Sequence, residues 1–444
     1  MTYLEIKDKY PKFIYDKYEI SENDEEINIT YYFEIPNLAK FTPSLKLFKK
    51  DIEINNFNRD FFNDLVFHIG LVELISYWKV AMPHEVVINA GYLDENQIKW
   101  FKKLYYNGLG EFFYQNDIHI SEDDFMIITC FGKKSAYEVN YLGNGNLIPI
   151  GGGKDSIVTI NLLKDYLSNS KAFIINPKEV HLECAKKSNL DSIIVNRFLD
   201  KRLIELNSEG FLNGHTPFSS LVSFVSLLSA YLANKKYIVL SNEASANEGN
   251  VVGENVNHQY SKSYEYECDF NSYVANYFKV DIKYFSLLRP LSELQIASLF
   301  AKYKEYHSTF KSCNVGSKSL PWKWCCSCPK CLFVYIILSP FLKKEELINI
   351  FGEELFAKED LLETFLELIG KSKHKPFECV GTYEEVNYSI CKTINNYEGN
   401  LPYLLDYYKN NYPLEYDDSI LHCFNDENNV PLEYIDIVKR SINE

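Results

Sequence analysis

The sequence lacks three features that would place the protein on nucleic acid, on a membrane or outside the cell. It has no excess of positive charge, because 46 lysines and arginines stand against 61 acidic residues and give a net charge of −15. Such a surface repels phosphate backbones and anionic lipid heads. The longest apolar run, residues 331–342, is too short to cross about 30 Å of hydrocarbon. The first residues, MTYLEIKDKYPKF, lack the apolar core of a signal peptide. We therefore expect a cytoplasmic protein that binds neither nucleic acid nor a membrane.

Internal repeats and low-complexity segments are also absent, so the 444 residues form an ordinary globular chain of about three domains at most. Apolar residues make up 46% of the chain, which is enough for a core without disulfides. Cysteine is sparse over most of the chain, but five of the eleven cysteines lie between residues 313 and 331. In a reducing compartment, such a cluster indicates a metal rather than disulfides.

The pattern of the sequence changes near residue 145. Strand-like alternation at residues 27–35 and helical spacing at residues 60–80 predict an N-terminal α+β domain over residues 1–145. Residues 146–342 alternate short apolar strands with helices, which predicts an α/β domain with an open, doubly wound, mostly parallel sheet. Residues 343–444 are predicted to be mainly helical. The expected strands are 147–150, 172–175, 237–240 and 282–288, and the expected helices are 156–167, 217–233, capped by Thr216, and 293–301, capped by Ser292.

The most informative segment is residues 148–156, IPIGGGKDS, in which an expected strand enters three glycines and then a helix. Glycines remove the Cβ atoms that would block a tight loop, so backbone N–H groups and the helix N-terminus can surround a pyrophosphate. Asp155 is suited to Mg²⁺, and Ser156 adds a hydroxyl. The alternative is a glycine-rich turn without a ligand. The expected nucleotide contacts here are Gly151, Gly152, Gly153, Lys154, Asp155 and Ser156.

This segment resembles the SGGxDS loop of the PP-loop (adenine nucleotide alpha hydrolase-like) enzymes, which split ATP into AMP and pyrophosphate. It departs from that pattern at Gly151, where those enzymes usually have serine, so that Ser156 alone supplies a hydroxyl. The resemblance implies that the end of the second strand, near Asn176, lies beside the adenine.

Four cysteines, Cys313, Cys325, Cys328 and Cys331, form the pattern C-x11-C-x2-C-x2-C. This spacing can place four thiolates tetrahedrally around Zn²⁺, and we expect a structural zinc site. The C-x2-C-x2-C part resembles the zinc site of 7-cyano-7-deazaguanine synthase, itself a PP-loop enzyme. Cys326 is an alternative to Cys325 as the ligand. A redox pair is the competing interpretation, but it leaves the other cysteines unexplained.

Polar segments follow the expected strands, at the edge where open α/β sheets bind their ligands. Arg289 and Lys262 are expected to meet a carboxylate or phosphate, whereas a surface arginine and a solvated loop are the alternatives. Near the C-terminus, KPFECVGTYEE places the Cys379 thiol among acids and glycine, although a buried structural cysteine is the default. The other candidate site residues in these segments are His215, Asn242, Glu243 and His258.

Together, GGGKDS, LSNEASANEGNV, VNHQYSKS, LLRPLSELQIA, the cysteine cluster and KPFECVGTYEE resemble the MurL family over about residues 147–390. That family comprises the UDP-N-acetyl-α-D-muramoyl-L-alanyl-L-glutamate epimerases, which invert the terminal L-Glu of a UDP-MurNAc-dipeptide to D-Glu for peptidoglycan. The resemblance implies dependence on ATP and Mg²⁺, with AMP and pyrophosphate as products. It leaves the oligomeric state open. The need to hold so long a ligand suggests that residues 1–145 bind the nucleotide-sugar end.

The implied chemistry is consistent with the residues. A proton beside a carboxylate is hardly acidic, but adenylating that carboxylate cancels its charge and lets a side-chain base remove the proton. Cys379 is the first candidate for this base. His215 and His258 are alternatives. Competing functions are another PP-loop ATP pyrophosphatase that acts on a carboxylate or a nucleobase-like molecule, and a zinc module without enzymatic activity.

Overall fold

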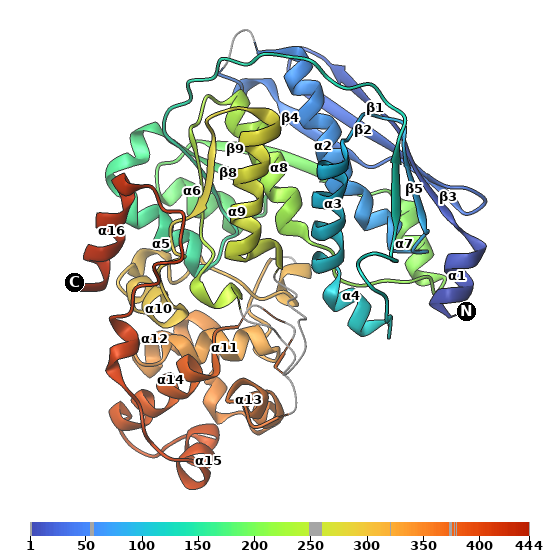
Figure 1. The fold of residues 1–444 in the computed structure, drawn as a ribbon. Helices are drawn as coiled ribbons and strands as arrows, with labels where there is room; N and C mark the ends of the chain where they lie inside the picture. The colour runs from blue at the N-terminus through green and yellow to red at the C-terminus, as the bar shows by residue number, and fades with distance from the viewer. Residues whose placement is uncertain are drawn as a thin grey trace.

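One mixed sheet of eleven strands forms the centre of the protein (Figure 1). The computed structural model describes residues 2–53, 57–247, 260–319, 321–372, 375–376, 378 and 380–443. None of the helices in these ranges combines the length and apolarity that crossing a bilayer requires. The strands are β1 (Lys12–Glu22), β2 (Glu26–Ile35), β3 (Ala39–Phe41), β4 (Ser44–Phe48), β5 (Glu85–Ile88), β6 (Ile127–Cys130), β7 (Asn146–Pro149), β8 (Ser170–Ile175), β9 (Ser192–Phe198), β10 (Tyr237–Leu240) and β11 (Lys283–Ser286).

Half of the sheet is parallel and is wound in both directions from β7. The strand order is β11-β10-β7-β8-β9, and each neighbouring pair in this part is parallel. The chain adds β8 and β9 on one side of β7 and then β10 and β11 on the other, so the winding reverses between β7 and β10. Ligands of such sheets bind in the crevice at this reversal. The prediction of a mixed α/β fold is confirmed.

The N-terminal half continues the same sheet in the order β4-β2-β1-β5-β6, with β3 paired to β2. Here β1, β2 and β4 are antiparallel neighbours, whereas β5 runs parallel to β1 and β6 parallel to β5. The two halves meet where β4 pairs antiparallel with β9, with Leu47 opposite Val195. The sheet therefore crosses the boundary expected at residue 145.

Alternation along the strands divides the apolar core into two layers. In β7, Leu147 belongs to the core on one face of the sheet, and Ile148 belongs to the core on the other. In β10, Ile238 and Val239 divide in the same way. This follows from the period of two in a strand, which turns successive side chains to opposite faces. A sheet buried on both faces needs helices on both.

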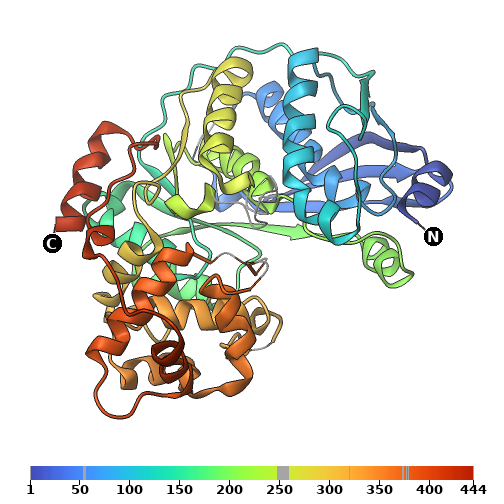
Figure 2. The ribbon, with the colours of Figure 1, turned by 60° about the horizontal axis from the view of Figure 1, so that its bottom comes forward.

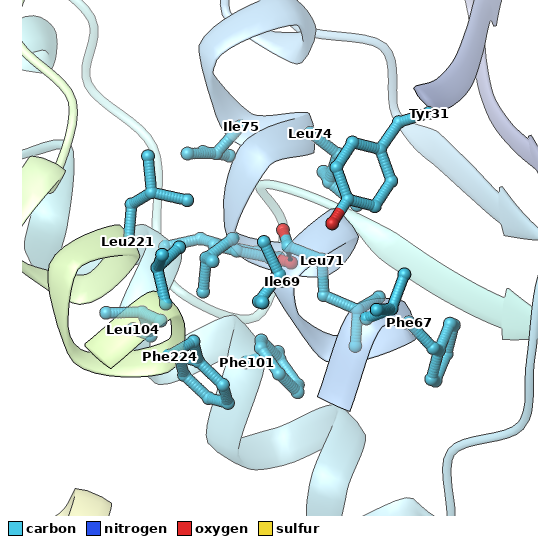
Figure 3. Close-up of a cluster of buried hydrophobic side chains, with 14 of the residues drawn as sticks. Tyr31, Phe67, Ile69, Leu71, Leu74, Ile75, Phe101, Leu104, Leu221 and Phe224 are labelled. Atoms are coloured by element: carbon cyan, nitrogen blue, oxygen red, sulfur yellow. Dashed lines mark hydrogen bonds between the residues drawn. The ribbon is translucent and has the colours of Figure 1, made fainter. Parts of the chain in front are cut away.

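The first face carries α2 (Arg59–Trp78), α3 (Glu95–Gly108), α8 (Phe218–Leu232) and α9 (Tyr264–Tyr273). The helix α2 is buried on nearly every side, because it lies between the sheet and its neighbouring helices. Figure 3 shows this packing, with side chains of α2 between Tyr31 of β2, Phe101 of α3 and Phe224 of α8. Three shorter helices, α1 (Tyr3–Lys9), α4 (Gly110–Gln115) and α7 (Lys201–Ser208), lie toward the N-terminal half of the sheet (Figure 1).

The second face is covered over its parallel half by α5 (Lys154–Leu162), α6 (Glu179–Lys187), α10 (Glu293–Ala301) and α11 (Pro329–Leu338). The helices that follow gather beneath this half (Figure 2). Under β2, by contrast, the outward side chains are partly exposed. The following helices are α12 (Lys344–Phe351), α13 (Leu362–Leu368), α14 (Tyr383–Asn396) and α15 (Tyr403–Asn411).

The helix α16 (Leu432–Asn443) returns to the sheet from the C-terminal helices (Figure 1). Its Tyr434 is 2% exposed and packs on Tyr237 of β10 and Phe285 of β11, with ring centroids 5.5 and 5.9 Å away. The Tyr434 hydroxyl donates to Asn146 Oδ1 of β7 at 2.8 Å. A residue of α16 thus completes the hydrogen bonding of the first residue of β7.

Two expected helices differ from the observed ones at their ends. The helix expected over residues 156–167 begins earlier, at Lys154, and gives way after Leu162 to a 3₁₀ segment, Lys164–Asn169. In α8, Pro217 occupies the capping position itself, and the Thr216 hydroxyl does not cap the helix. Pro217 has a ψ of 71°, which is outside the helical region, so the helix begins only with the next residue.

Candidate active site

The glycine loop (residues 150–153) joins β7 to α5 at the reversal point of the sheet. Gly152 has a left-handed backbone with φ of +76°, and an added Cβ would lie 2.8 Å from Val180 Cγ1 and 2.9 Å from His181 Cδ2. Glycine alone fits this position. Gly153 takes the N-cap position of α5, and no described side chain caps the helix. Its first N–H groups therefore remain for an anion.

A cavity of about 450 Å³ opens beside the glycine loop, at the carboxyl ends of β7, β8 and β10. This is the crevice in which the ligands of doubly wound sheets bind. Its lining includes Gly151, Gly153, Asp155 and Ser156; Ile175, Leu240, Ser241 and Asn242 at strand ends; Phe218, Ser219 and Val222 of α8; and His181, Lys262, Ser312, Asn314, Trp322 and Lys330.

The cavity is more positive than the chain as a whole. Among its described lining residues, Lys262 and Lys330 carry positive charge and Asp155 carries negative charge. Burial, assisted by Lys178, lowers the pKa of His181 to about 4, so this imidazole is neutral at neutral pH. In a protein with a net charge of −15, such a cavity favours an anionic ligand.

Asp155 and Ser156 lie on the wall of the cavity, whereas Lys154 is not among the described residues that line it. Lys154 is 2% exposed, and its ammonium contacts the carboxylates of Asp155 and Glu293. Burial alone would lower the pKa of Lys154, but these two carboxylates outweigh burial and raise it. Burial raises the pKa of Glu293, with Lys154 acting in the opposite direction. Lys154 therefore holds the Asp155 carboxylate, and a direct phosphate contact by Lys154 stays a prediction.

Asn242 and Glu243, which follow β10 after Ser241, are adjacent in the chain but differ in access. Asn242 lines the cavity, and its carbonyl accepts a hydrogen bond from the Ser286 hydroxyl at 2.5 Å. Glu243 is 8% exposed and accepts from the Ser245 hydroxyl at 3.4 Å. The segment thus places Asn242 on the cavity wall, whereas Glu243 is buried.

Asn176 directly follows β8 and has a left-handed conformation with φ of +50°. Its Oδ1 accepts from the backbone N–H of Arg197 at 2.6 Å. The carboxamide is thereby engaged with β9, and it is Ile175 that lines the cavity.

Arg289 is fully buried and supports the cavity wall. Its guanidinium donates to the carbonyls of Glu243 at 2.8 Å and Lys262 at 2.5 Å, and it lies 3.3 Å from the Glu267 carboxylate. Burial raises the pKa of Glu267, and Arg289 opposes this. Arg289 therefore ties together the segments that carry Asn242 and Lys262. This position favours a supporting role over direct contact with substrate.

The three candidates for the inverting base differ in what the structure describes. His215 lies before α8, with Nδ1 3.8 Å from Glu111 Oε2 of α4, and is not among the described residues that line the cavity. His258 and Cys379 lie outside the described residues. Asn314, which lines the cavity, donates to the Glu378 carboxylate at 2.5 Å. This contact brings the C-terminal motif to the edge of the cavity.

The rest of that motif packs against the start of α10. Thr382 and Glu385 form a capping box at α14, and Glu385 Oε1 also accepts from the Leu294 N–H at 3.2 Å. A Cβ added at Gly381 would lie 2.7 Å from Glu385 Oε2 and 3.3 Å from Glu293 Cβ. The motif therefore lies beside the buried Glu293 that contacts Lys154.

The four predicted metal ligands, Cys313, Cys325, Cys328 and Cys331, lie together, with all their sulfurs within 4.8 Å of one another. Three sulfur pairs are 3.5, 3.7 and 3.8 Å apart. A tetrahedron of sulfurs about 2.3 Å from a central zinc has edges of about 3.8 Å. The quartet therefore fits a metal ion, compatible with structural zinc.

Cys326 does not belong to this quartet. Its backbone is left-handed with φ of +55°, and its thiol donates to the Phe351 carbonyl at 3.2 Å, away from the other sulfurs. Cys325 is thus the member of the quartet, and the alternative of Cys326 as ligand is wrong. Four cavity-lining residues lie close in sequence to the cysteines: Ser312, Asn314, Trp322 and Lys330. The quartet therefore shapes one wall of the cavity.

Two family models match almost all of this architecture. The MurL N-terminal domain matches residues 5–287, and the MurL C-terminal domain matches residues 309–414. The chain belongs to the MurL family. The resemblance seen in the motifs is confirmed, and the match includes the N-terminal half of the sheet.

Curated relatives carry the same name. The UDP-N-acetyl-alpha-D-muramoyl-L-alanyl-L-glutamate epimerase of Xanthomonas oryzae pv. oryzae is 36% identical over 325 residues, 71% of either chain. The protein of that name from Micromonospora sp. is also 36% identical, over 71% of this chain and 72% of its own. That of Salinispora tropica is 35% identical over 318 residues, 70% of this chain and 69% of its own. No solved structure matches this chain.

The structure of this MurL family member also brings residues to the cavity that sequence reasoning missed: His181, Trp322 and Lys330. For Trp322 and Lys330 a signal existed, because both lie among the clustered cysteines. For His181 no motif was available, because it stands three residues into an unremarkable helix after β8.

Proposed function

We propose that the protein is an epimerase that inverts the terminal L-glutamate of UDP-MurNAc-L-Ala-L-Glu to D-glutamate, with conversion of ATP to AMP and pyrophosphate. The observation that carries this proposal is the identity of 35–36%, over about 70% of their length, to proteins named for this substrate. The product would enter peptidoglycan synthesis.

The role of ATP in the proposal follows from the acidity of the substrate. Removing the α-proton of a free carboxylate places a second negative charge beside the first. Adenylation of that carboxylate removes the first charge, so a side-chain base of ordinary strength suffices. Reprotonation from the opposite face then inverts the carbon, and hydrolysis of the adenylate releases AMP.

The cavity supports a PP-loop type of ATP site. The glycine loop stands at the reversal of the sheet, and the uncapped start of α5 faces the cavity with Asp155 and Ser156. We assign the glycine loop and Ser156 to the phosphates and Asp155 to Mg²⁺, which when bound neutralises phosphate charge. Lys262 and Lys330 line the same cavity, and we assign them to the phosphates or to the substrate carboxylate.

For the inverting base, we propose Cys379, supported by the contact of its neighbour Glu378 with the cavity-lining Asn314. The substitution Cys379→Ser is expected to abolish exchange of the glutamate α-proton in D₂O while MgATP still binds. Cys423→Ser is the matched control, because that cysteine is exposed elsewhere and should be silent. Undiminished exchange in Cys379→Ser would remove this thiol from the mechanism.

The function is tested by incubating the purified protein with MgATP and UDP-MurNAc-L-Ala-L-Glu, hydrolysing the product and determining the chirality of its glutamate. D-Glutamate together with AMP is the expected result. Asp155→Asn should abolish both. Recovery of L-glutamate alone from protein that binds ATP would retain the ATP site and refute the substrate, leaving another ATP pyrophosphatase activity.

A further inference from the structure

Lys154, the first residue of α5, is paired with two carboxylates and does not line the cavity. Its side chain is 3% exposed, and it is not among the described lining residues, whereas its neighbours Gly153 and Asp155 are. The Lys154 ammonium donates to Asp155 Oδ1 and to Glu293 Oε2. A buried ammonium is costly unless it is paired, and the two carboxylates supply the pairing. Lys154 therefore contacts a residue of the cavity wall without forming part of that wall.

The Asp155 carboxylate has one oxygen held and one available. Its Oδ1 accepts the hydrogen bond from Lys154, and Oδ2 has no hydrogen-bond partner among the described residues. The side chain is 30% exposed and lies on the cavity wall. Mg²⁺ demands ligands in near-ideal octahedral positions, so a carboxylate that binds it gains from being held in one orientation. The contact with Lys154 provides such a hold.

A distant segment fixes the position of Lys154. Its second partner, Glu293, lies 139 residues further along the chain, is 1% exposed and opens α10 directly after the capping Ser292. The C-terminal motif packs on this turn, because a Cβ added at Gly381 would lie 3.3 Å from Glu293 Cβ. Moving the ammonium into the cavity would leave the buried Glu293 carboxylate without its hydrogen-bonded cation, which is strongly unfavourable.

We propose that Lys154 is a positioning residue that holds Asp155 Oδ1, so that the other carboxylate oxygen stays available to the Mg²⁺ of MgATP, and that Lys154 itself does not touch the nucleotide. Glu293 takes part by holding the same ammonium. This inference rests on the proposed ATP site and on the assignment of Asp155 to Mg²⁺. The lysines that line the cavity, Lys262 and Lys330, remain the cations assigned to the ligand.

A double-mutant cycle separates action through Asp155 from a direct contact with phosphate. Lys154→Met and Glu293→Gln are introduced together, so that the buried carboxylate and its cation are removed as a pair. This paired variant is then combined with Asp155→Asn. Lys164→Met, which removes an exposed lysine from the segment after α5, is the control. MgATP binding by calorimetry, and KM for Mg²⁺ against kcat for pyrophosphate release, are measured on full-length, zinc-loaded protein.

We expect the paired variant to weaken MgATP binding by about tenfold or more, and to act mainly on KM for Mg²⁺, because it removes a hydrogen bond to a charged group. On the Asp155→Asn background, the same pair should change binding by less than about twofold, as should Lys164→Met on the parent background.

Unchanged binding in the paired variant, with binding by the parent protein, would overturn the inference alone. A loss of about tenfold on the Asp155→Asn background would show that Lys154 acts on the nucleotide directly, and would also overturn it. Failure of the parent protein to bind MgATP would refute the proposed function as well.

Labelling of the parent protein covers the case in which the substituted proteins do not fold. Its lysines are reductively methylated with and without MgATP, and the modified positions are read by mass spectrometry. Lys154 is expected to stay unmodified in both states, because its ammonium is buried and held by two carboxylates. Methylation of Lys154 in the absence of nucleotide would show that its ammonium is open to the cavity, and would overturn the inference.

Discussion

Replacing Gly152 by alanine tests the geometry of the glycine loop without reference to any ligand. A left-handed conformation costs an L-residue about 1–2 kcal/mol. The added Cβ must also displace Val180 Cγ1 and His181 Cδ2, both closer than 3.0 Å, and overpacking of this kind costs about 1–3 kcal/mol. Loss of chain entropy in the unfolded state returns about 0.4–1 kcal/mol. The free energy of unfolding should therefore fall by about 1–5 kcal/mol.

The matched control is the glycine immediately before it. A Cβ added at Gly151 meets nothing within 4 Å, and its backbone is not left-handed. Gly151→Ala should therefore leave the free energy of unfolding within about 1 kcal/mol of the parent protein. Because Gly151 lines the cavity, the same substitution is still expected to weaken MgATP binding.

Urea unfolding followed by tryptophan fluorescence measures both substitutions against the parent protein. The expected result is a large loss of stability for Gly152→Ala alone. Equal stabilities of the two substituted proteins would show that Gly152 is neither left-handed nor packed against α6 in solution. That result would refute the loop geometry.

Three further predictions concern the surroundings of the cavity. The purified protein should hold about one zinc ion per chain. Cys325→Ser should lose this zinc, and Cys326→Ser should retain it. Equal zinc contents of these two substituted proteins in elemental analysis would contradict the assigned quartet. Glu293→Gln should lower the free energy of unfolding, measured in urea, by about 2–4 kcal/mol, because it leaves Lys154 with one carboxylate. Glu205→Gln, which removes the exposed ion pair with Arg202, should change this free energy by less than about 1 kcal/mol. Similar losses in the two substituted proteins would argue against the buried cluster of Lys154, Asp155 and Glu293. Burial lowers the pKa of His181 from 6.5 to about 4, so the imidazole binds a proton more tightly in the unfolded chain than in the folded one. The protein should therefore lose stability as the pH falls from 6.5 to 4, by up to about 3 kcal/mol. Urea unfolding at pH 7 and pH 4.5 should show a steeper loss for the parent protein than for His181→Gln, and parallel losses would refute the burial of a neutral imidazole.

Local patterns were sufficient for the elements that depend on local interactions. The strand at Tyr237–Leu240 has the bounds that its apolar run predicts. The capping box of Ser292 and Gln295 opens α10 as expected, because both partners lie within one turn. Four thiols that must surround one ion are recognisable by their spacing, and they do lie together.

Features set by distant segments could not be predicted in this way. The pairing of β4 with β9 joins residues about 150 positions apart, and no local pattern specifies it. Arg289 follows a strand, as a ligand-binding arginine would, yet its guanidinium turns inward to carbonyls of segments remote in sequence. His181 meets the glycine loop and Trp322 only in the folded chain, because the three lie on segments remote in sequence.

The contact of α16 with β7 has a consequence for the order of events during synthesis. Tyr434 lies 288 residues after Asn146 in the chain. After Asn146 of β7 has been made, the ribosome therefore needs about 15–60 s to reach Tyr434. Until then, the edge of the aromatic cluster formed by Tyr237 and Phe285 lacks its cover. A nascent chain that has already made the whole glycine loop therefore still exposes an apolar surface, on which a chaperone can bind. The sheet edge beside the glycine loop reaches its final packing only after translation has passed Tyr434.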